Sequence, residues 1–177
     1  NVTGVQTCAL PILESQGARD IGLKWPNDVL WRGKKLAGLL IEMQGDALGP
    51  SAVVIGVGIN VRLSDDARAR IDQPVTDMET ILQRDADRNA LLAAALSQMN
   101  QALLAFERDG FTPLRAEWQR RHVYQDRTVR LITQGQNGAR GESGIARGVS
   151  DDGALLLETA RGLKPIHSGE EIGRAHV

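Results

Sequence analysis

The stretch from Leu23 to Val61 constrains the fold of this chain more than any other part of the sequence. It reads LKWPNDVLWRGKKLAGLLIE, then the loop MQGDALGPS, then AVVIGVGINV. Short apolar runs bounded by Gly, Pro, Asn and Asp are typical of strands and turns. The two longest runs are apolar enough to be buried on much of both faces. We therefore predict a sheet built around a central hairpin, with strands at 21–25, 29–31, 36–43 and 51–61.

Three features of this stretch indicate a binding site rather than packing alone. The string Lys24-Trp25-Pro26-Asn27-Asp28 places an amide and a carboxylate after a short apolar run, and its proline stiffens the turn. Lys35 stands at the start of the apolar run LAGLLI. Gly56 and Gly58 interrupt a β-branched strand, and a glycine inside a strand usually marks the close approach of a ligand or another backbone. A plain hairpin accounts for the aliphatic residues but not for these features.

Composition supports an ordinary globular chain in which lysine is used selectively. The 177 residues are 42% hydrophobic and 24% charged with a net charge of -1, so no electrostatic footprint for nucleic acid is present. Of 21 basic residues only four are lysines, and three of these lie at positions 24, 34 and 35. This clustering indicates that the compact ammonium group of lysine has a specific function at these positions, because arginine cannot replace lysine wherever a point charge must contact an anion. No apolar run reaches a membrane span, and the single Cys8 indicates a cytoplasmic setting.

The two ends of the chain differ from the rest. Residues 1–12, NVTGVQTCALPI, show neither helix periodicity nor strand alternation, and they lack the architecture of a signal peptide. They resemble translated sequencing-adapter read-through, as does the tail EIGRAHV at 171–177. We therefore expect both segments to be non-native and to take no part in the fold.

Helices and then a second group of strands follow the central stretch. Gly17 closes the last turns of a helix at 13–18, and Asp87 is the expected N-cap of the longest helix. Asp152-Gly153 predicts a hairpin in a small barrel of SH3-like size, which must pack on the larger part of the chain. The other expected elements are helices at 65–71, 77–83 and 112–121 (anchored by Trp118), and strands at 128–133, 144–149 and 154–158. The apolar stripe Leu92, Leu96, Met99, Leu103 and Phe106 is interpreted as core packing.

The order of three motifs resembles the catalytic domain of biotin–protein ligases, also called biotin–[acetyl-CoA-carboxylase] ligases. The motifs are Lys-Trp-Pro-Asn-Asp at 24–28, Lys-Leu-Ala-Gly at 35–38 and Gly-Val-Gly-Ile-Asn at 56–60, and residues 153–157 and 164–165 resemble the C-terminal domain of that family. The resemblance implies an α+β fold over 13–124, a mixed β-sheet with packed helices like that of class II aminoacyl-tRNA synthetases. An SH3-like β-barrel over 125–170 would follow.

The resemblance also implies a reaction and roles for individual residues. ATP would convert biotin to biotinyl-5′-AMP, and the biotin would then pass to a lysine of the biotin carboxyl carrier protein domain of acetyl-CoA carboxylase. Lys35 would hold the biotin carboxyl oxygen and stabilise charge at the α-phosphate. Asp28 would be a catalytic carboxylate and a ligand of Mg²⁺. Nucleotide would be bound by Lys24, Asn27 and Asn60, and the biotin slot would be lined by Lys35, Gly38, Leu40, Gly56 and Val57.

Plainer interpretations of the same residues stay open. Lys35 could be a strand-edge lysine whose stem covers apolar surface, a role that suits Lys34 better, and Asp28 could simply cap a turn. Core packing explains Leu40 and Val57 equally well. The sequence gives His122 and His167 no role.

The sequence also departs from the family it resembles. The family's Gly/Arg-rich loop, its Ser/Thr-containing strand and the Gln of its biotin site are absent, as is a basic residue expected after Glu170. We therefore expect a truncated copy that binds biotin and ATP poorly and does not turn over. A lipoate- or octanoate-transferring relative and a non-catalytic regulatory or interaction module remain alternatives. A homodimer formed through an edge strand is plausible, and DNA binding would require an N-terminal winged helix.

Overall fold

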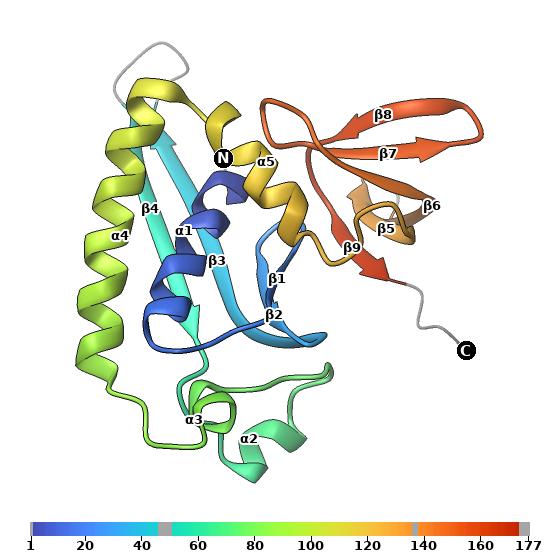
Figure 1. Cartoon of the computed structure of the whole chain (residues 1–177). Coiled ribbons are helices and arrows are strands. Elements are labelled where there is room, and N and C mark those ends of the chain that lie inside the picture. Colours follow the sequence, from blue (N-terminus) through green and yellow to red (C-terminus); the bar gives the residue numbers. More distant parts are fainter. Residues whose placement is uncertain (1, 46–50, 136–137, 174–177) are drawn as a thin grey trace.

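The computed structural model of the protein describes residues 2–45, 51–135 and 138–173 (Figure 1). Its helices are α1 (Val2–Ser15), α2 (Asp65–Ala69), α3 (Met78–Leu82), α4 (Arg88–Asp109) and α5 (Thr112–Arg121). Its strands are β1 (Ile21–Lys24), β2 (Asp28–Trp31), β3 (Lys34–Gly45), β4 (Ser51–Ile59), β5 (Thr128–Gly135), β6 (Gly138–Val149), β7 (Leu155–Thr159), β8 (Gly162–Ile166) and β9 (Glu170–Gly173). Within these ranges, no helix has the length and hydrophobicity needed to cross a bilayer.

The first sheet has the strand order β1-β2-β3-β4, and every neighbouring pair is antiparallel. This differs from the mixed sheet expected from the sequence. Short hairpin connections between consecutive strands allow only antiparallel pairing, whereas parallel pairs need a long crossover. Parallel pairing among the described residues is limited to two isolated bridges, Leu23 with His122 and Lys35 with Val75.

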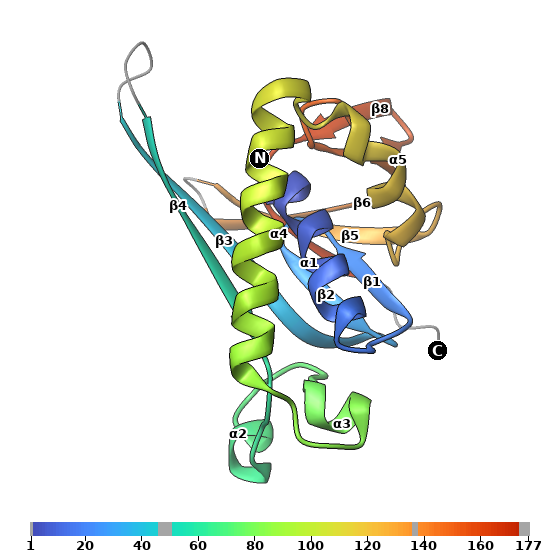
Figure 2. The same cartoon turned by 60° about the vertical axis from the view of Figure 1, so that its left-hand side comes forward.

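Helices α1 and α4 lie side by side on one face of this sheet (Figures 1 and 2). Because side chains alternate along a strand, Leu39 and its partner Val57 point to the helix-covered face and join the core. Their neighbours Gly38 and Leu40 point to the opposite face, where Leu40 is exposed. The two faces of β3 and β4 therefore differ in burial, and Gly38 and Leu40 lie on the face that the helices leave open.

The expectation that residues 1–12 take no part in the fold is wrong. Residues 2–12 form most of α1, which packs against α4, α5, β2 and β3. Side chains are buried on almost every side of α1. Its apolar residues are therefore not confined to one face of the helix, and the sequence lacks the spacing that identifies an amphipathic helix. Residues 171–173 likewise belong to β9, which pairs with β5. A non-native origin for both segments stays a prediction.

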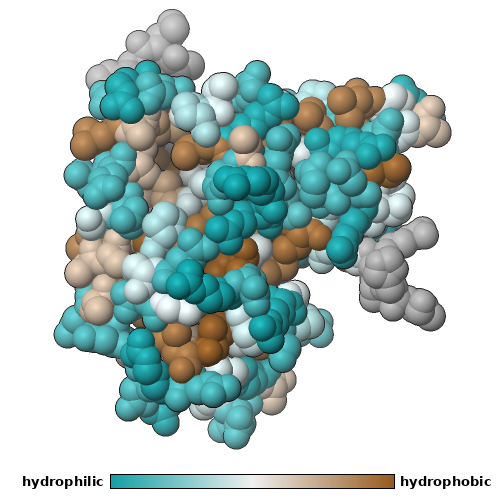
Figure 3. All heavy atoms as spheres, in the orientation of Figure 1, coloured by the Kyte–Doolittle hydropathy of each residue, from teal (hydrophilic) through white to brown (hydrophobic). Residues whose placement is uncertain are grey.

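The apolar stripe of α4 does not point into the core. Leu91 is 4% exposed and faces the sheet, whereas Leu92 and Leu96 are 59% and 65% exposed. Leu92 and Leu96 line an open groove between α4 and β4, and hydrophobic residues remain visible among hydrophilic ones on this side of the molecule (Figure 3). Periodicity correctly identified an apolar helix face, but it cannot say whether another element covers that face.

Most local predictions are confirmed. Asp87 caps α4 by accepting hydrogen bonds from two backbone amides, and α4 ends at Asp109 with Gly110 as its C-cap. Helix α5 has the predicted bounds, although its N-cap is Phe111 and no side chain caps it. Asp152-Gly153 forms the turn between β6 and β7, and Gly153 has a φ of 80°, a conformation that favours glycine.

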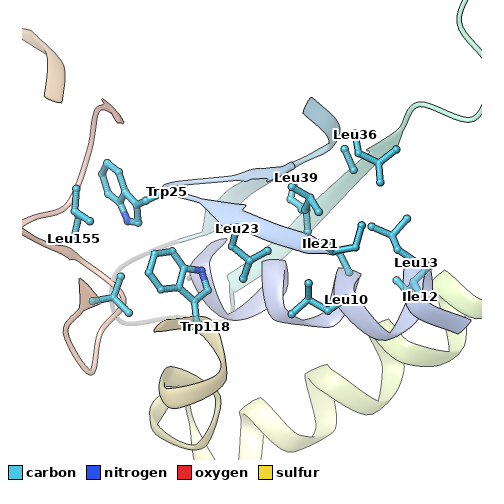
Figure 4. Close-up of a cluster of buried hydrophobic side chains, with 14 of the residues drawn as sticks. Leu10, Ile12, Leu13, Ile21, Leu23, Trp25, Leu36, Leu39, Trp118 and Leu155 are labelled. Carbon is cyan, nitrogen blue, oxygen red and sulfur yellow. The ribbon is translucent and has the colours of Figure 1, made fainter. Parts of the chain in front are cut away.

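The second sheet has the order β8-β7-β6-β5-β9 and shares one core with the first. Trp25 lies beside Leu155 of β7, and Trp118 of α5 lies close to both (Figure 4). The indole of Trp25 is 2% exposed and donates a hydrogen bond of 3.2 Å to the carbonyl oxygen of Gly153. The prediction that the small sheet packs on the larger part is therefore confirmed.

Cys8 tests the position of α1. Burial raises the pKa of its thiol from 9.0 to about 11, and only the thiolate reacts with disulfide reagents. At pH 8 we expect the folded protein to react roughly a hundredfold more slowly than the urea-unfolded protein, because a higher pKa leaves a smaller fraction of the thiol ionised. Equal rates would show that residues 1–12 are unstructured, as the sequence suggested.

A pair of leucines on α4 tests which face of that helix is buried. Leu91→Ala should lower the free energy of unfolding by about 2–5 kcal/mol, because it leaves a cavity in the core. Leu96→Ala should change it by less than about 0.5 kcal/mol, because that side chain is already exposed. Urea unfolding measures both values, and equal losses would place the apolar stripe inside.

Candidate active site

Two lysines and one carboxylate meet where the first three strands come together. The ammonium Nζ of Lys35 lies 2.6 Å from Oδ1 of Asp28, and Nζ of Lys24 lies 3.7 Å from Oδ2 of the same carboxylate. The register creates this meeting, because Asp28 pairs with Lys24 on β1 and with Gly38 on β3. An irregularity in the β2–β3 register after Val29 brings Lys35 opposite Leu30.

The three charged groups are partly withdrawn from water. The exposed fractions of the side chains are 12% for Lys24, 10% for Asp28 and 30% for Lys35. Two ammonium groups around one carboxylate leave an excess positive charge, and partial burial reduces its screening. A fourth charge comes from the second sheet, since Oε1 of Glu170 lies 3.4 Å from Nζ of Lys24. Glu170 offsets this excess, so the four groups together carry no net charge, while Asp28 holds both lysines in place.

The pocket around these charges lies between the two sheets. It is lined by Lys24, Trp25, Pro26, Asn27, Asp28, Lys35, Gln73, Gly169 and Glu170. The structure thus brings four predicted site residues into one pocket. The Trp25–Pro26 peptide bond in its wall is cis.

The main chain of Lys35 is held from the side opposite β2. Its N–H donates to the carbonyl oxygen of Pro74 at 2.8 Å, and its carbonyl oxygen accepts from the N–H of Thr76 at 3.0 Å. The side-chain amide of Asn60 also donates to that carbonyl oxygen, at 3.3 Å, and to the carbonyl oxygen of Thr76 at 3.1 Å. Asn60 therefore supports the backbone beside the site, and its contact with a nucleotide stays a prediction.

A glycine-rich lane runs from the charged cluster along β3 and β4. Gly38 pairs with Gly58, and Leu40 pairs with Gly56, so all four face the same side of the sheet. A Cβ atom added to Gly38 would lie 3.4 Å from Cε of Lys35 and 3.8 Å from Oδ1 of Asp28, so the lane begins at these groups. Beyond it, a Cβ at Gly58 would meet nothing closer than 3.8 Å.

The residues predicted for the biotin slot lie on two different faces of the sheet. Gly38, Leu40 and Gly56 share the face with the glycine lane, and Leu40 is 57% exposed there, which rules out core packing for it. The side chain of Val57 lies on the other face and packs against the core. Val57 therefore fits the packing interpretation, and only its backbone borders the lane.

The described residues do not form a metal site by themselves. Both oxygens of Asp28 face lysine ammonium groups, and the described residues contain no cluster of three or more His, Cys, Asp or Glu side chains suited to a metal ion. Mg²⁺ is commonly held by one or two carboxylates together with substrate phosphates. The residues present therefore do not fit a resident ion, and coordination by Asp28 stays a prediction.

His122 and His167 lie outside the pocket lining. Nε2 of His122 is 2.9 Å from Oε2 of Glu171, and both side chains are fully buried. His167 is exposed, with Nδ1 3.7 Å from Asp152. The pocket residues that sequence reasoning missed are Gln73, Gly169 and Glu170, which reach it only through long-range folding, whereas the glycine pattern already pointed to Gly58.

Comparison with known proteins gives two family matches. Residues 9–60 match the Biotin/lipoate A/B protein ligase family, and residues 126–170 match the Biotin protein ligase C terminal domain. The chain is 35% identical over 163 residues to the bifunctional ligase/repressor BirA of Escherichia coli K12, covering 90% of this chain and 48% of that protein. It is 31% identical over 160 residues to the biotin–[acetyl-CoA-carboxylase] ligase of Paracoccus denitrificans, covering 86% and 63%. The chain thus spans about half to two-thirds of these relatives.

Solved structures with a similar architecture include a biotin protein ligase. The apo structure of the Aquifex aeolicus enzyme has a TM-score of 0.81 and 27% identity, with 99% of this chain and 74% of that chain covered. The structure of the same enzyme in complex with biotin and ATP has a TM-score of 0.77, also at 27% identity, with 99% and 70% covered. The similarity extends over both sheets.

Proposed function

The chain belongs to the biotin protein ligase family, and we propose that it is the later part of an enzyme that attaches biotin to a carrier protein. In the proposed reaction, a carboxylate oxygen of biotin attacks the α-phosphorus of ATP, and pyrophosphate leaves. A lysine amine of the carrier then attacks the acyl carbon of biotinyl-5′-AMP, and AMP leaves. The biotin–[acetyl-CoA-carboxylase] ligase among the relatives supports a biotin carboxyl carrier domain as the acceptor.

The observation that carries the proposal is the Lys24–Asp28–Lys35 cluster at the start of the glycine lane. Attack of one anion on another is slow unless positive charge neutralises their repulsion, and preorganised charges stabilise the transition state most effectively. Lys35 meets this need from the end of the lane, where the carboxylate of a bound biotin would lie. Lys24 and Asn27 would bind the nucleotide from the other wall of the pocket. Mg²⁺ would enter only with the phosphates of ATP.

The glycine lane supports a flat, largely apolar ring system as the other substrate. Backbone edges at Gly38, Gly56 and Gly58 can approach a ligand closely because no side chain intervenes. A lipoyl group has a similar length, and the family model over 9–60 covers lipoate ligases as well. The match to the C-terminal domain of biotin protein ligases favours biotin.

We propose further that the chain as given is inactive by itself. The lane lies on an open sheet face, with Leu40 57% exposed, so the described residues supply only one wall of a biotin slot. The E. coli relative is about twice as long as the matched part, which supports a missing second wall. The chain alone should therefore show no biotin-dependent ATP–pyrophosphate exchange. A rate comparable to that of the Aquifex aeolicus enzyme would overturn this proposal.

Lys35 and its neighbour Lys34 provide a matched test of the mechanism. We would join this chain to the part of the E. coli relative that it does not match and measure biotin transfer to a carboxyl carrier domain. Lys35→Met should lower kcat by about 100-fold or more, because it removes the charge at the reacting carboxylate. Lys34→Met should change it less than about twofold, because Lys34 is exposed beside the pocket. Equal effects would contradict the role of Lys35, and preference for lipoate would favour the alternative substrate.

Gly58 tests the lane as the binding surface. Gly58→Val places a side chain in open space, so the unfolding midpoint should stay the same or rise. In the joined protein, the same variant should weaken biotin binding by about tenfold or more, since it fills the lane. Calorimetric titration with biotin measures this, and Ser143→Val on β6, outside the lane, is the control. Unchanged affinity would place biotin elsewhere.

A further inference from the structure

A buried carboxylate lies between the end of β4 and the start of α3. Asp77 is 3% exposed, and its two oxygens have separate partners. Oδ1 accepts a hydrogen bond of 2.8 Å from the N–H of Thr80, and Oδ2 accepts one of 2.9 Å from the N–H of Leu63. Oδ2 also forms an ion pair with the guanidinium of Arg68. Asp77 thus contacts three separate parts of the chain.

These contacts close the segment 62–77 on itself. Leu63 stands shortly after β4, Arg68 lies in α2 and Asp77 ends the segment, so one carboxylate ties both ends and the middle together. The guanidinium of Arg68 also donates to Oγ1 of Thr80 at 3.0 Å. The ends of the segment are also joined by backbone bonds, from the N–H of Met78 to the carbonyl oxygen of Asn60 and from the N–H of Glu79 to that of Val61, and the side-chain bonds of Asp77 add to these.

The closed segment is the one that holds the main chain of Lys35. Pro74 accepts from the N–H of Lys35, and Thr76 donates to its carbonyl oxygen, which makes a short parallel bridge just before Asp77. The same segment brings Gln73 into the pocket lining. The position of Lys35 therefore depends on β2 on one side and on segment 62–77 on the other.

We propose that Asp77, with Arg68, is a positioning residue for Lys35: it closes the segment 62–77 so that Pro74 and Thr76 hold the backbone of the lysine beside Asp28. A helix cap alone would need only the bond from Thr80, whereas the bonds from Leu63 and Arg68 lie outside α3. The inference deepens the proposed function, because it gives Lys35 a fixed place in the site.

The charge state of Asp77 agrees with this arrangement. Burial by itself would raise the pKa of its carboxyl group, but the hydrogen bonds from Thr80 and Leu63 and the charge of Arg68 outweigh it. The pKa therefore lies below the ordinary value of 3.8, and the carboxylate is ionised at neutral pH. An ionised acceptor makes stronger hydrogen bonds than a neutral one, which suits a group that joins three segments.

The test is amide hydrogen exchange in this chain, followed residue by residue with NMR. Asp77→Ser keeps a residue that can cap α3 but is too short to reach Leu63 and Arg68 as well. Asp87→Ser makes the same substitution at the cap of α4, where the carboxylate bonds only the amides of Asn89 and Ala90. We expect exchange of the Lys35 and Thr76 amides to become about tenfold faster or more in the first variant and to change less than twofold in the second.

Amides of β5, in the other sheet, separate local opening from global destabilisation. They should keep their exchange rates in Asp77→Ser. Unchanged protection at Lys35, or an equal loss in β5, would overturn the proposal. If Asp77→Ser does not fold, Arg68→Gln replaces it as the test variant, because it leaves the bond from the N–H of Thr80 to Asp77 intact. Exchange of the Lys35 amide should then become about threefold faster, while exchange in β5 stays unchanged. Hydrogen exchange needs neither biotin nor turnover. A negative result would therefore overturn the role of Asp77 without affecting the proposed function, and a failure of the proposed function would not affect the role of Asp77.

Discussion

The burial of Trp25 between the two sheets sets the geometry of the whole site. Its indole lies against Leu155, and the indole N–H is satisfied by the carbonyl oxygen of Gly153, so a large aromatic group is buried without an unpaired donor. Lys24 precedes Trp25 and Asp28 follows it after a short turn. Fixing the ring therefore fixes both charged groups at the junction of the sheets, and a pocket with walls from both sheets follows.

The chemistry of that pocket comes from an uneven division of the first sheet. One face is covered by α1 and α4 and holds the core, including Leu39 and Val57. The other face carries charge at one end, followed by glycine backbone and the exposed side chain of Leu40. A substrate with a carboxylate at one end and an apolar ring system at the other matches this division. The openness of this face agrees with the proposal that the described residues supply only one wall of a biotin slot.

Two errors in reading the sequence have a common physical cause. Residues 2–15 form a helix that is enclosed on nearly all sides, and the stripe on α4 is an apolar face that the described residues leave open. Periodicity reports how apolar residues are distributed around a helix axis, and burial depends on what lies next to it. The local spacing of apolar residues therefore does not show that α1 is surrounded by other elements, nor that one apolar face of α4 is left uncovered.

Local features of this protein can be read from the amino-acid order: the strands of the central stretch, the cap at Asp87, the turn at Gly153 and the motifs that place Lys24, Asp28 and Lys35 near one another. These features depend on short-range backbone preferences and on hairpin register, which act between residues close in the chain. Long-range packing, in contrast, brings Gln73 and Glu170 into the pocket and closes a segment against Lys35 through Asp77. Those contacts join residues far apart in the chain, and their geometry is set by the packing of the two sheets and the connecting segment. No local pattern specifies that packing.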